Sequence, residues 1–293
     1  MSAHGEIPAV APKAKLLAFP RVTAQEKRLL VPREHGAWAL WLLPLITGGV
    51  VGFVRGGATA APALWFSLVA IAAFLIHQPL ESLLGVSIVR LRSPREQRVA
   101  VLWVIGLTAV AALAVMELVL LHRGLVLLIG VAALSCFVLA ALCRRARALR
   151  IAKQLIGALG LTSTAAGAYY VVAGRLSNLA LSLWLASWLF AAAQIEYVQL
   201  RLATANARSR RDKINAAWPV CLLHVAILAG ATTGAVALHF PKFLPLAFVP
   251  AVVRIFAWMF SPARTLKLYL LGFSELFQNI VFAALLAVAF IVR

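Results

Sequence analysis

The chain is short of charged residues, and of acidic residues above all. Only 13% of its 293 residues are charged, and Asp and Glu together number 9, with Asp212 as the one Asp. Apolar residues make up 63% of the chain, against roughly 45–50% in an ordinary soluble protein. Because a soluble globule cannot bury that much apolar surface, the composition argues strongly against a soluble enzyme.

Cysteine is also scarce, and the amino-terminal stretch lacks the features of a signal peptide. Cys136, Cys143 and Cys221 form no C-x-x-C pair, so the sequence predicts neither a zinc site nor a disulfide framework. Residues 1–30 have no apolar core region before the first long apolar block. Scattered prolines and basic residues there predict a disordered cytosolic tail over 1–31, followed by a transmembrane helical domain over 32–293.

Long apolar blocks, separated by short basic, Gly or Pro breaks, fill the rest of the chain. Their length suits helices that cross a bilayer, and a lipid-exposed backbone must satisfy its polar groups internally. The sequence therefore predicts an all-α polytopic membrane protein of about nine spans. These spans are Gly36–Val54, Ala61–Leu84, Val99–Leu121, Leu125–Leu142, Ile151–Ala173, Asn178–Leu200, Ala216–Leu238, Phe243–Phe260 and Leu268–Val292.

The distribution of basic residues predicts the orientation of these spans. Lys and Arg number 28, for a net charge of +19, and most lie in the tail and in alternate connections. Because cytoplasmic segments carry the excess of Lys and Arg, we expect the amino end in the cytosol and the carboxyl end outside. A bacterial inner membrane fits this pattern. The positive charge then sets the orientation of the spans and attracts anionic lipid. This explanation disfavours nucleic acid as a partner.

Three acids are predicted to lie within the membrane, on the cytosolic side. At 1.5 Å per residue, Glu81, Glu196 and Glu275 sit about 5–10 Å inside their spans. Ionisable residues at such depth usually face the bundle interior or a wet cavity. A structural ion pair or snorkelling would place them equally well.

Polar residues at the same side of the membrane form the predicted site. His77 and Glu81 are spaced to share a helix face, but two ligands are weak evidence for a metal, and none is predicted. Glu81, Glu196 and His35 are the candidate catalytic residues, as acid–base groups. Candidate residues for an anionic ligand are Arg33, Arg90, Arg95, Lys153, Arg201, Arg208 and Lys267, with ordinary lipid phosphate as the alternative partner. Candidate supporting residues are Glu34, His77, Gln78, Gln194, Gln199, Asn206 and Glu275.

Two local patterns predict structure rather than chemistry. The spacing Gly48-x-x-x-Gly52, and the pair Gly157 and Gly160, favour close approach of neighbouring helices. The stretch from Ser93 to Glu96 has the pattern of a helix capping box.

The segment Pro32-Arg33-Glu34-His35-Gly36-Ala37-Trp38 resembles the signature of the YwiC-like membrane protein family. We expect the likeness to run from Arg33 to the end of the chain, including Lys267 and Gly272–Glu275. This resemblance implies a membrane protein and no particular reaction.

The predicted architecture is also similar to that of the UbiA-type intramembrane prenyltransferases. That resemblance implies a helical bundle whose active site faces the cytosol, near the connections Glu81–Arg98 and Glu196–Lys213. Those enzymes hold Mg²⁺ and a prenyl diphosphate with Asp-rich motifs, and this chain has no Asp at either candidate motif. Hard cations need several oxygen ligands, so Mg²⁺ is poorly supported and the cofactor stays open. Arg can bind a diphosphate directly.

Three functions are consistent with these features. The first is a UbiA-like intramembrane enzyme, a prenyl- or lipid-group transferase, or a lipid-binding derivative of one. It would hold the anionic head of an isoprenoid or other lipid in a cytosol-facing polar cavity. The second is a transporter or permease for a small anion or lipid, which the odd number of spans and the lack of a clear repeat disfavour. The third is a non-enzymatic membrane assembly factor.

Overall fold

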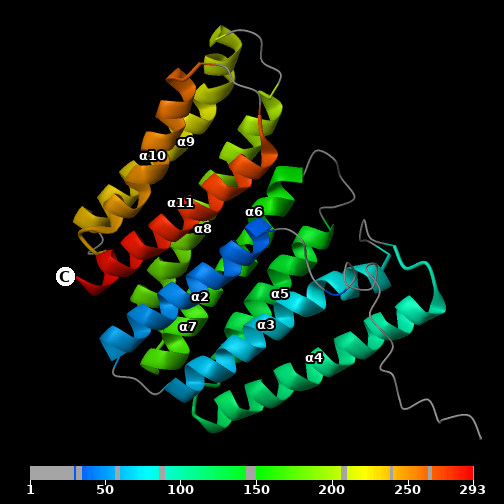
Figure 1. Cartoon of the computed structure of the whole chain (residues 1–293). Coiled ribbons are helices and arrows are strands. Elements are labelled where there is room, and N and C mark those ends of the chain that lie inside the picture. The colour runs from blue at the N-terminus through cyan, green and yellow to red at the C-terminus, as the bar shows by residue number, and fades with distance from the viewer. Residues whose placement is uncertain are drawn as a thin grey trace, which may run out of the picture.

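The computed structural model describes residues 30, 35–56, 60–85, 90–142, 150–205, 210–237, 240–262 and 266–292. Over these residues the chain forms helices and no strand (Figure 1), which confirms the predicted all-α class. The helices are α2 (His35–Gly56), α3 (Ala60–Leu83), α4 (Pro94–Leu120), α5 (Val126–Leu142), α6 (Arg150–Thr162), α7 (Thr164–Ala173), α8 (Asn178–Ala203), α9 (Arg210–Ala237), α10 (Leu244–Phe260) and α11 (Leu268–Ile291).

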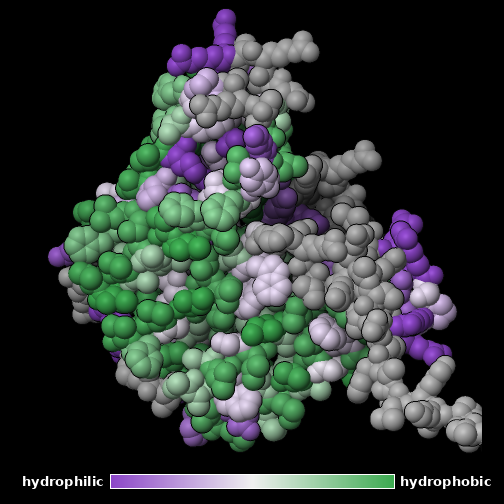
Figure 2. Space-filling view, viewed as in Figure 1, coloured by the Kyte–Doolittle hydropathy of each residue, from purple (hydrophilic) through white to green (hydrophobic). Residues whose placement is uncertain are grey.

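Seven helical segments of the described chain are long and apolar enough to cross a membrane, with α6 and α7 together forming one of them. Two further apolar helices, α5 and α10, are shorter. Figure 2 shows a broad apolar surface on this face of the molecule, with hydrophilic residues gathered toward its edges. Large apolar side chains such as Leu102 and Val236 are exposed. Exposed apolar surface on this scale indicates an integral membrane protein.

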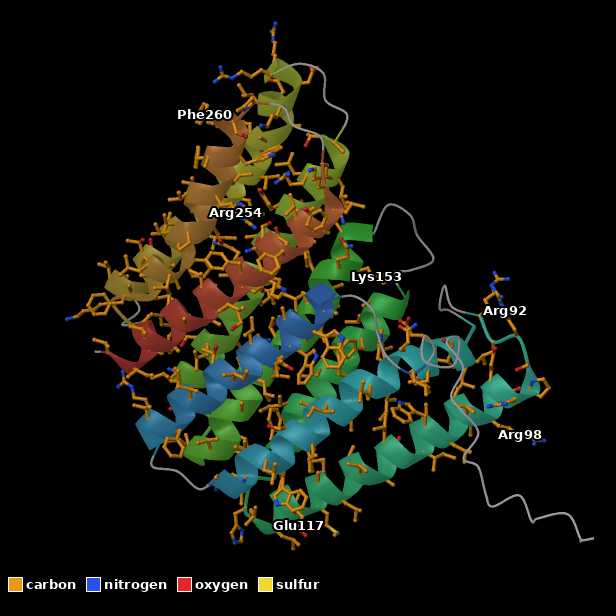
Figure 3. All side chains as sticks on the ribbon, in the orientation of Figure 1. Arg92, Arg98, Glu117, Lys153, Arg254 and Phe260 are labelled. Carbon is orange, nitrogen blue, oxygen red and sulfur yellow. The ribbon has the colours of Figure 1, made fainter. Side chains whose placement is uncertain are left out.

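The helices form a bundle in which α8 is central. It packs against α6, α7, α9, α10 and α11, and its buried face is rich in alanine. Helices α9 and α10 pair with each other, and α10 packs against α11. Helices α3 and α4 pair at the opposite side of the bundle, where α3 packs against α7 (Figure 1). We call the end where α4, α6 and α9 begin the basic end. Arg92, Arg98 and Lys153 lie toward it, and Glu117 lies at the other end (Figure 3).

The predicted fifth span is interrupted between α6 and α7, at Ser163. The Ser163 N–H donates to the carbonyl of Gly160, at 3.3 Å, instead of continuing the regular ladder. The hydroxyls of Thr162, Ser163 and Thr164 all donate to carbonyls three or four residues earlier. Such hydroxyls offer the backbone an alternative to the helix. The indole of Trp184, on α8, donates to the neighbouring Leu159 carbonyl at 2.9 Å and so fixes the break against the central helix.

Glycine allows α2 and α7 to approach closely. A Cβ on Gly48 would overlap the backbone carbonyl of Ala165, and one on Gly52 would lie 3.0 Å from the Tyr169 carbonyl oxygen. The predicted packing role of this spacing is therefore confirmed. It is also confirmed for Gly160, where a Cβ would meet the Cβ of a buried cysteine at 3.1 Å, but it is wrong for Gly157, which has open space around it.

The capping box at the start of α4 is confirmed, with one difference. The Ser93 hydroxyl accepts the Glu96 N–H at 3.2 Å, as the pattern predicts. The Glu96 carboxylate, however, accepts the N–H of Arg92 at 2.7 Å rather than that of the cap residue.

Candidate functional site: a buried cationic cluster between α8, α9, α10 and α11

Arg254, on α10, is the centre of a buried polar cluster. Its Nη1 lies 2.7 Å from Oε1 of Glu275 on α11, and the two side chains are only 16% and 13% exposed. Its Nη2 donates to the side-chain oxygen of Gln194 on α8. Its guanidinium lies over the ring of Tyr197, also on α8, 3.9 Å from the ring centroid. One arginine therefore joins three helices of the bundle.

Two more cations continue the cluster toward the basic end. Arg201 donates to the Tyr197 hydroxyl at 2.9 Å and lies 5.4 Å from the centroid of the Trp258 ring. Lys213, on α9, lies over the same Trp258 ring as Arg201, and its Nζ is 4.5 Å from the ring centroid. Its ammonium donates to the Ser261 carbonyl at 2.7 Å, so Lys213 also caps the carboxyl end of α10.

Several buried donors and acceptors of this region have no protein partner among the described residues. They are Nε of Arg254, Nε2 of Gln194, Nε2 of His224 and Nε2 of Gln278. Nδ1 of His224 lies 2.8 Å from the Val220 carbonyl and must donate to it, because a carbonyl only accepts. Buried polar atoms without partners are costly, so they indicate bound water or a ligand at this place.

The cluster lies within the apolar part of the bundle. At 1.5 Å per residue, Arg254 is about 9 Å from the end of α10 and Glu275 about 10 Å from the start of α11. Figure 3 shows Arg254 on α10, and its bonds place it on the side of that helix which faces α8 and α11. Charged groups at such depth are expensive and usually functional.

The electrostatics of the cluster favour an anion. Arg201, Lys213 and Arg254 carry positive charge around the Tyr197 and Trp258 rings, and the carboxylate of Glu275 pairs with Arg254. Arg254 is neutralised by that contact, whereas Arg201 and Lys213 face aromatic rings and neutral oxygens. No group of three or more His, Cys, Asp or Glu suited to a metal occurs in the described part of the chain.

The structure brings some of the predicted site residues together. Glu275, Gln194 and Arg201, named from the sequence, meet around Arg254 and Tyr197. Glu275 forms an ion pair with Arg254. A structural ion pair was the alternative explanation for an acid at this depth.

The predicted catalytic acids, Glu81 and Glu196, lie on α3 and α8. Glu81 bonds His77 within α3, with 3.1 Å between Oε1 and Nε2, so the predicted shared face is present. Gln78 is half-buried on the same helix, which packs against α4 and α7 and not against α10 or α11. Glu196 is half-buried on α8. The three predicted membrane acids therefore do not share one set of contacts.

The remaining predicted residues are dispersed. Gln199 donates to Gln154 on α6 at 3.3 Å, and Lys153 is half-buried on that helix. Arg90 and Arg95 are exposed at the start of α4, and Lys267 is exposed at the start of α11. Outside the described residues or side chains lie Arg33, Glu34, His35, Asn206 and Arg208.

Arg254, Lys213 and His224 were not among the predicted site residues. For Arg254 a signal was present, because it is a charge within an apolar span at nearly the same depth as Glu275. Two opposite charges at equal depth are candidates for a pair. Lys213 looked like one more basic residue of a cytosolic connection, and nothing in its neighbourhood marked it as buried.

Fold and site together define a polytopic helical membrane protein with a buried cationic cluster near one end. Residues 31–170 of the chain match the model of the YwiC-like protein family, which confirms the resemblance carried by the motif at Pro32–Trp38. The match includes α2 to α6 and most of α7, and it stops before the helices that hold the cluster. The expected likeness at Lys267 and Gly272–Glu275 therefore stays a prediction. No curated protein matches the chain.

Proposed function

We propose that this protein binds the anionic head group of a membrane amphiphile, such as a prenyl diphosphate or another lipid. The site is the basic end of α8, α9, α10 and α11. In this proposal the protein is either a prenyl- or lipid-group transferase of the UbiA-like kind or a lipid-binding derivative. The basic end faces the cytosol of a cell whose inner membrane the chain crosses nine times.

The observation that carries the proposal is the stacking of three cations on two aromatic rings, where Glu275 forms an ion pair with Arg254. Cation–π contacts hold cationic side chains in place without neutralising them. A phosphate or diphosphate would supply the missing negative charge and form strong charge-assisted hydrogen bonds with Arg.

Arg201 is the residue expected to contact the ligand. One of its five N–H donors is used by Tyr197, and its side chain is half-buried near the end of α8. Arg254 is a positioning residue, because its Nη1 and Nη2 donate to Glu275 and Gln194 and its guanidinium lies over the Tyr197 ring. Lys213 contributes charge from its place at the end of α10.

The predicted catalytic acids keep a role only in the enzyme form of this proposal. Glu196 lies on α8, the helix that carries Arg201 and Tyr197, and is the better placed general base. Glu81 belongs to α3, on the far side of α7. A transferase built on this cluster would therefore use Glu196 rather than Glu81.

Ligand binding tests the proposal. Thermal unfolding of the purified full chain is measured with prenyl diphosphates of several chain lengths, with and without Mg²⁺, and with the matching prenyl alcohols. A ligand at about a hundred times its dissociation constant adds roughly 2.7 kcal/mol to stability. We expect stabilisation by the diphosphates, none by the alcohols, and at least a tenfold weaker affinity in Arg201→Gln.

Arg98→Gln is the matched control, since Arg98 is exposed on α4 at the same end of the bundle (Figure 3). It should bind like the wild type. An equal loss of diphosphate affinity in Arg201→Gln and Arg98→Gln would mean that general surface charge, rather than a specific site, attracts the ligand. No stabilisation by any diphosphate or anionic lipid, from protein that unfolds cooperatively, would overturn the proposal.

A transporter is the second candidate, and the interruption between α6 and α7 favours it. Broken helices near the middle of the membrane are typical of transporters. Uptake of a labelled anion into liposomes, lost in Arg201→Gln, would support transport. Binding without uptake would support the lipid-binding form.

A further inference from the structure

A small polar cavity lies in the middle of the bundle, between α2, α6, α8 and α11. Four of its lining residues are polar, one from each helix: Thr47, Thr162, Ser187 and Asn279. All four are at most 9% exposed. Thr47, Ser187 and Asn279 lie near the middle of their helices, so the cavity lies near the middle of the membrane.

The cavity has room for one small ligand. The cavity has a volume of about 20 Å³, and a single bound water needs roughly 10–15 Å³. Apolar residues such as Phe282 and Leu286 complete the lining, which shields the polar atoms from the surrounding lipid.

The hydroxyls of Thr162 and Ser187 offer the cavity acceptors. The Thr162 hydroxyl donates to the Ala158 carbonyl at 2.8 Å, and the Ser187 hydroxyl donates to the Leu183 carbonyl at 2.8 Å. Each hydroxyl has one proton, so each oxygen offers only lone pairs to any other partner.

Asn279 adds a further acceptor. Its Nδ2 donates to the Glu275 carbonyl at 2.7 Å, and since a carbonyl can only accept, the amide orientation is determined. Oδ1 and the second N–H of the amide are then left for other partners. The Thr47 hydroxyl also lines the cavity, and its oxygen can offer a lone pair.

From these acceptors we infer that the cavity binds a monovalent metal cation. Four neutral side-chain oxygens with no acidic side chain among the lining residues suit a hard cation of single charge. An anion would need more donors than the Asn279 amide and the Thr47 hydroxyl can supply, and an apolar ligand would leave the oxygens unpaired. This site shares no side chain with the anion cluster, and it is independent of the proposed head-group site.

Direct binding tests the inference. Binding of radioactive Na⁺ and of Rb⁺, as a tracer for K⁺, is measured on the purified full chain at constant ionic strength set with choline chloride. We expect saturable binding of at least one of the two ions, and a melting temperature that rises with that ion and not with choline.

Ser187→Ala should weaken this binding at least tenfold, because it removes one oxygen ligand. Ser182→Ala is the matched control, since Ser182 is also buried on α8 and donates to a carbonyl of its own helix, but does not line the cavity. Thr47→Val, which keeps the side-chain shape, provides a second test should the serine variant fail to fold.

No saturable binding of either ion would overturn the inference and leave the cavity to water. Binding that survives both Ser187→Ala and Thr47→Val, or that falls equally in Ser182→Ala, would overturn it as well. Prenyl diphosphate binding by the same preparations separates this result from the head-group proposal, because the two sites use different residues.

Discussion

Replacing Arg254 by methionine should be among the most damaging single changes in this protein. The arginine side chain is 16% exposed and its partner Glu275 is 13% exposed. Arg254→Met would leave the carboxylate buried without a counterion, and breaking a buried pair in this way costs about 3–5 kcal/mol. Loss of the contact with the Tyr197 ring, at 3.9 Å, adds to this cost.

The double variant Arg254→Met, Glu275→Leu separates the charge effect from general damage. Because it removes both charges, its stability should lie within about 1 kcal/mol of the wild type or above it. The two single variants would add up to about 6 kcal/mol or more if they acted independently. The expected result is therefore a strongly non-additive cycle.

Unfolding of the purified full chain by denaturant in detergent micelles measures the four free energies of this cycle. Glu275→Gln is a useful fifth protein, because it keeps a side-chain oxygen for Arg254 while removing the negative charge. An Arg254→Met cost under about 1 kcal/mol, or a double variant as unstable as the sum of the singles, would refute the buried ion pair.

Three further predictions can be checked with the same unfolding assay. Gly48→Ala should cost about 1–3 kcal/mol, because its methyl group would overlap the Ala165 backbone. Gly157→Ala, with open space around it, should be neutral or raise stability by up to about 1 kcal/mol; equal losses at both glycines would contradict the packing account. Ser93→Ala should cost about 1 kcal/mol by removing the cap of α4, and Ser93→Thr should restore most of it. His122→Gly should be tolerated or stabilising by up to about 1 kcal/mol, since His122 has a φ of 58°, and a large loss there would mean that its side chain matters more than its backbone.

Sequence periodicity and length were sufficient to predict most helices of this chain. The bounds of α2, α3 and α11 agree with the predicted spans to within two residues at either end, because long apolar blocks in lipid have few alternatives to a helix. The break at Ser163 was missed. Its signal was the run Thr162-Ser163-Thr164, three hydroxyls that each compete for helix carbonyls.

The site was less accessible from the sequence, because depth in the membrane does not determine which helices are neighbours. Glu275 was found by its depth, but its partner was not. The acid Glu81, about 5 Å inside its predicted span against about 10 Å for Glu275, pairs locally with His77 instead. Only the packing of α10 between α9 and α11 decides that Arg254 meets the acid of α11.

The contact between α2 and α11 has a consequence for biogenesis. Arg55 of α2 donates to the Phe290 carbonyl of α11 at 2.9 Å, across a separation of 235 residues. At roughly 5–20 residues per second, synthesis of the intervening chain takes on the order of 10–50 s. During that time the face of α2 that later receives α11 has only lipid or the insertion machinery as its neighbour. The side of the bundle between α2 and α11 therefore closes late. A ribosome that stalls before α11 leaves a bundle that is open on that side, which quality-control proteases can recognise.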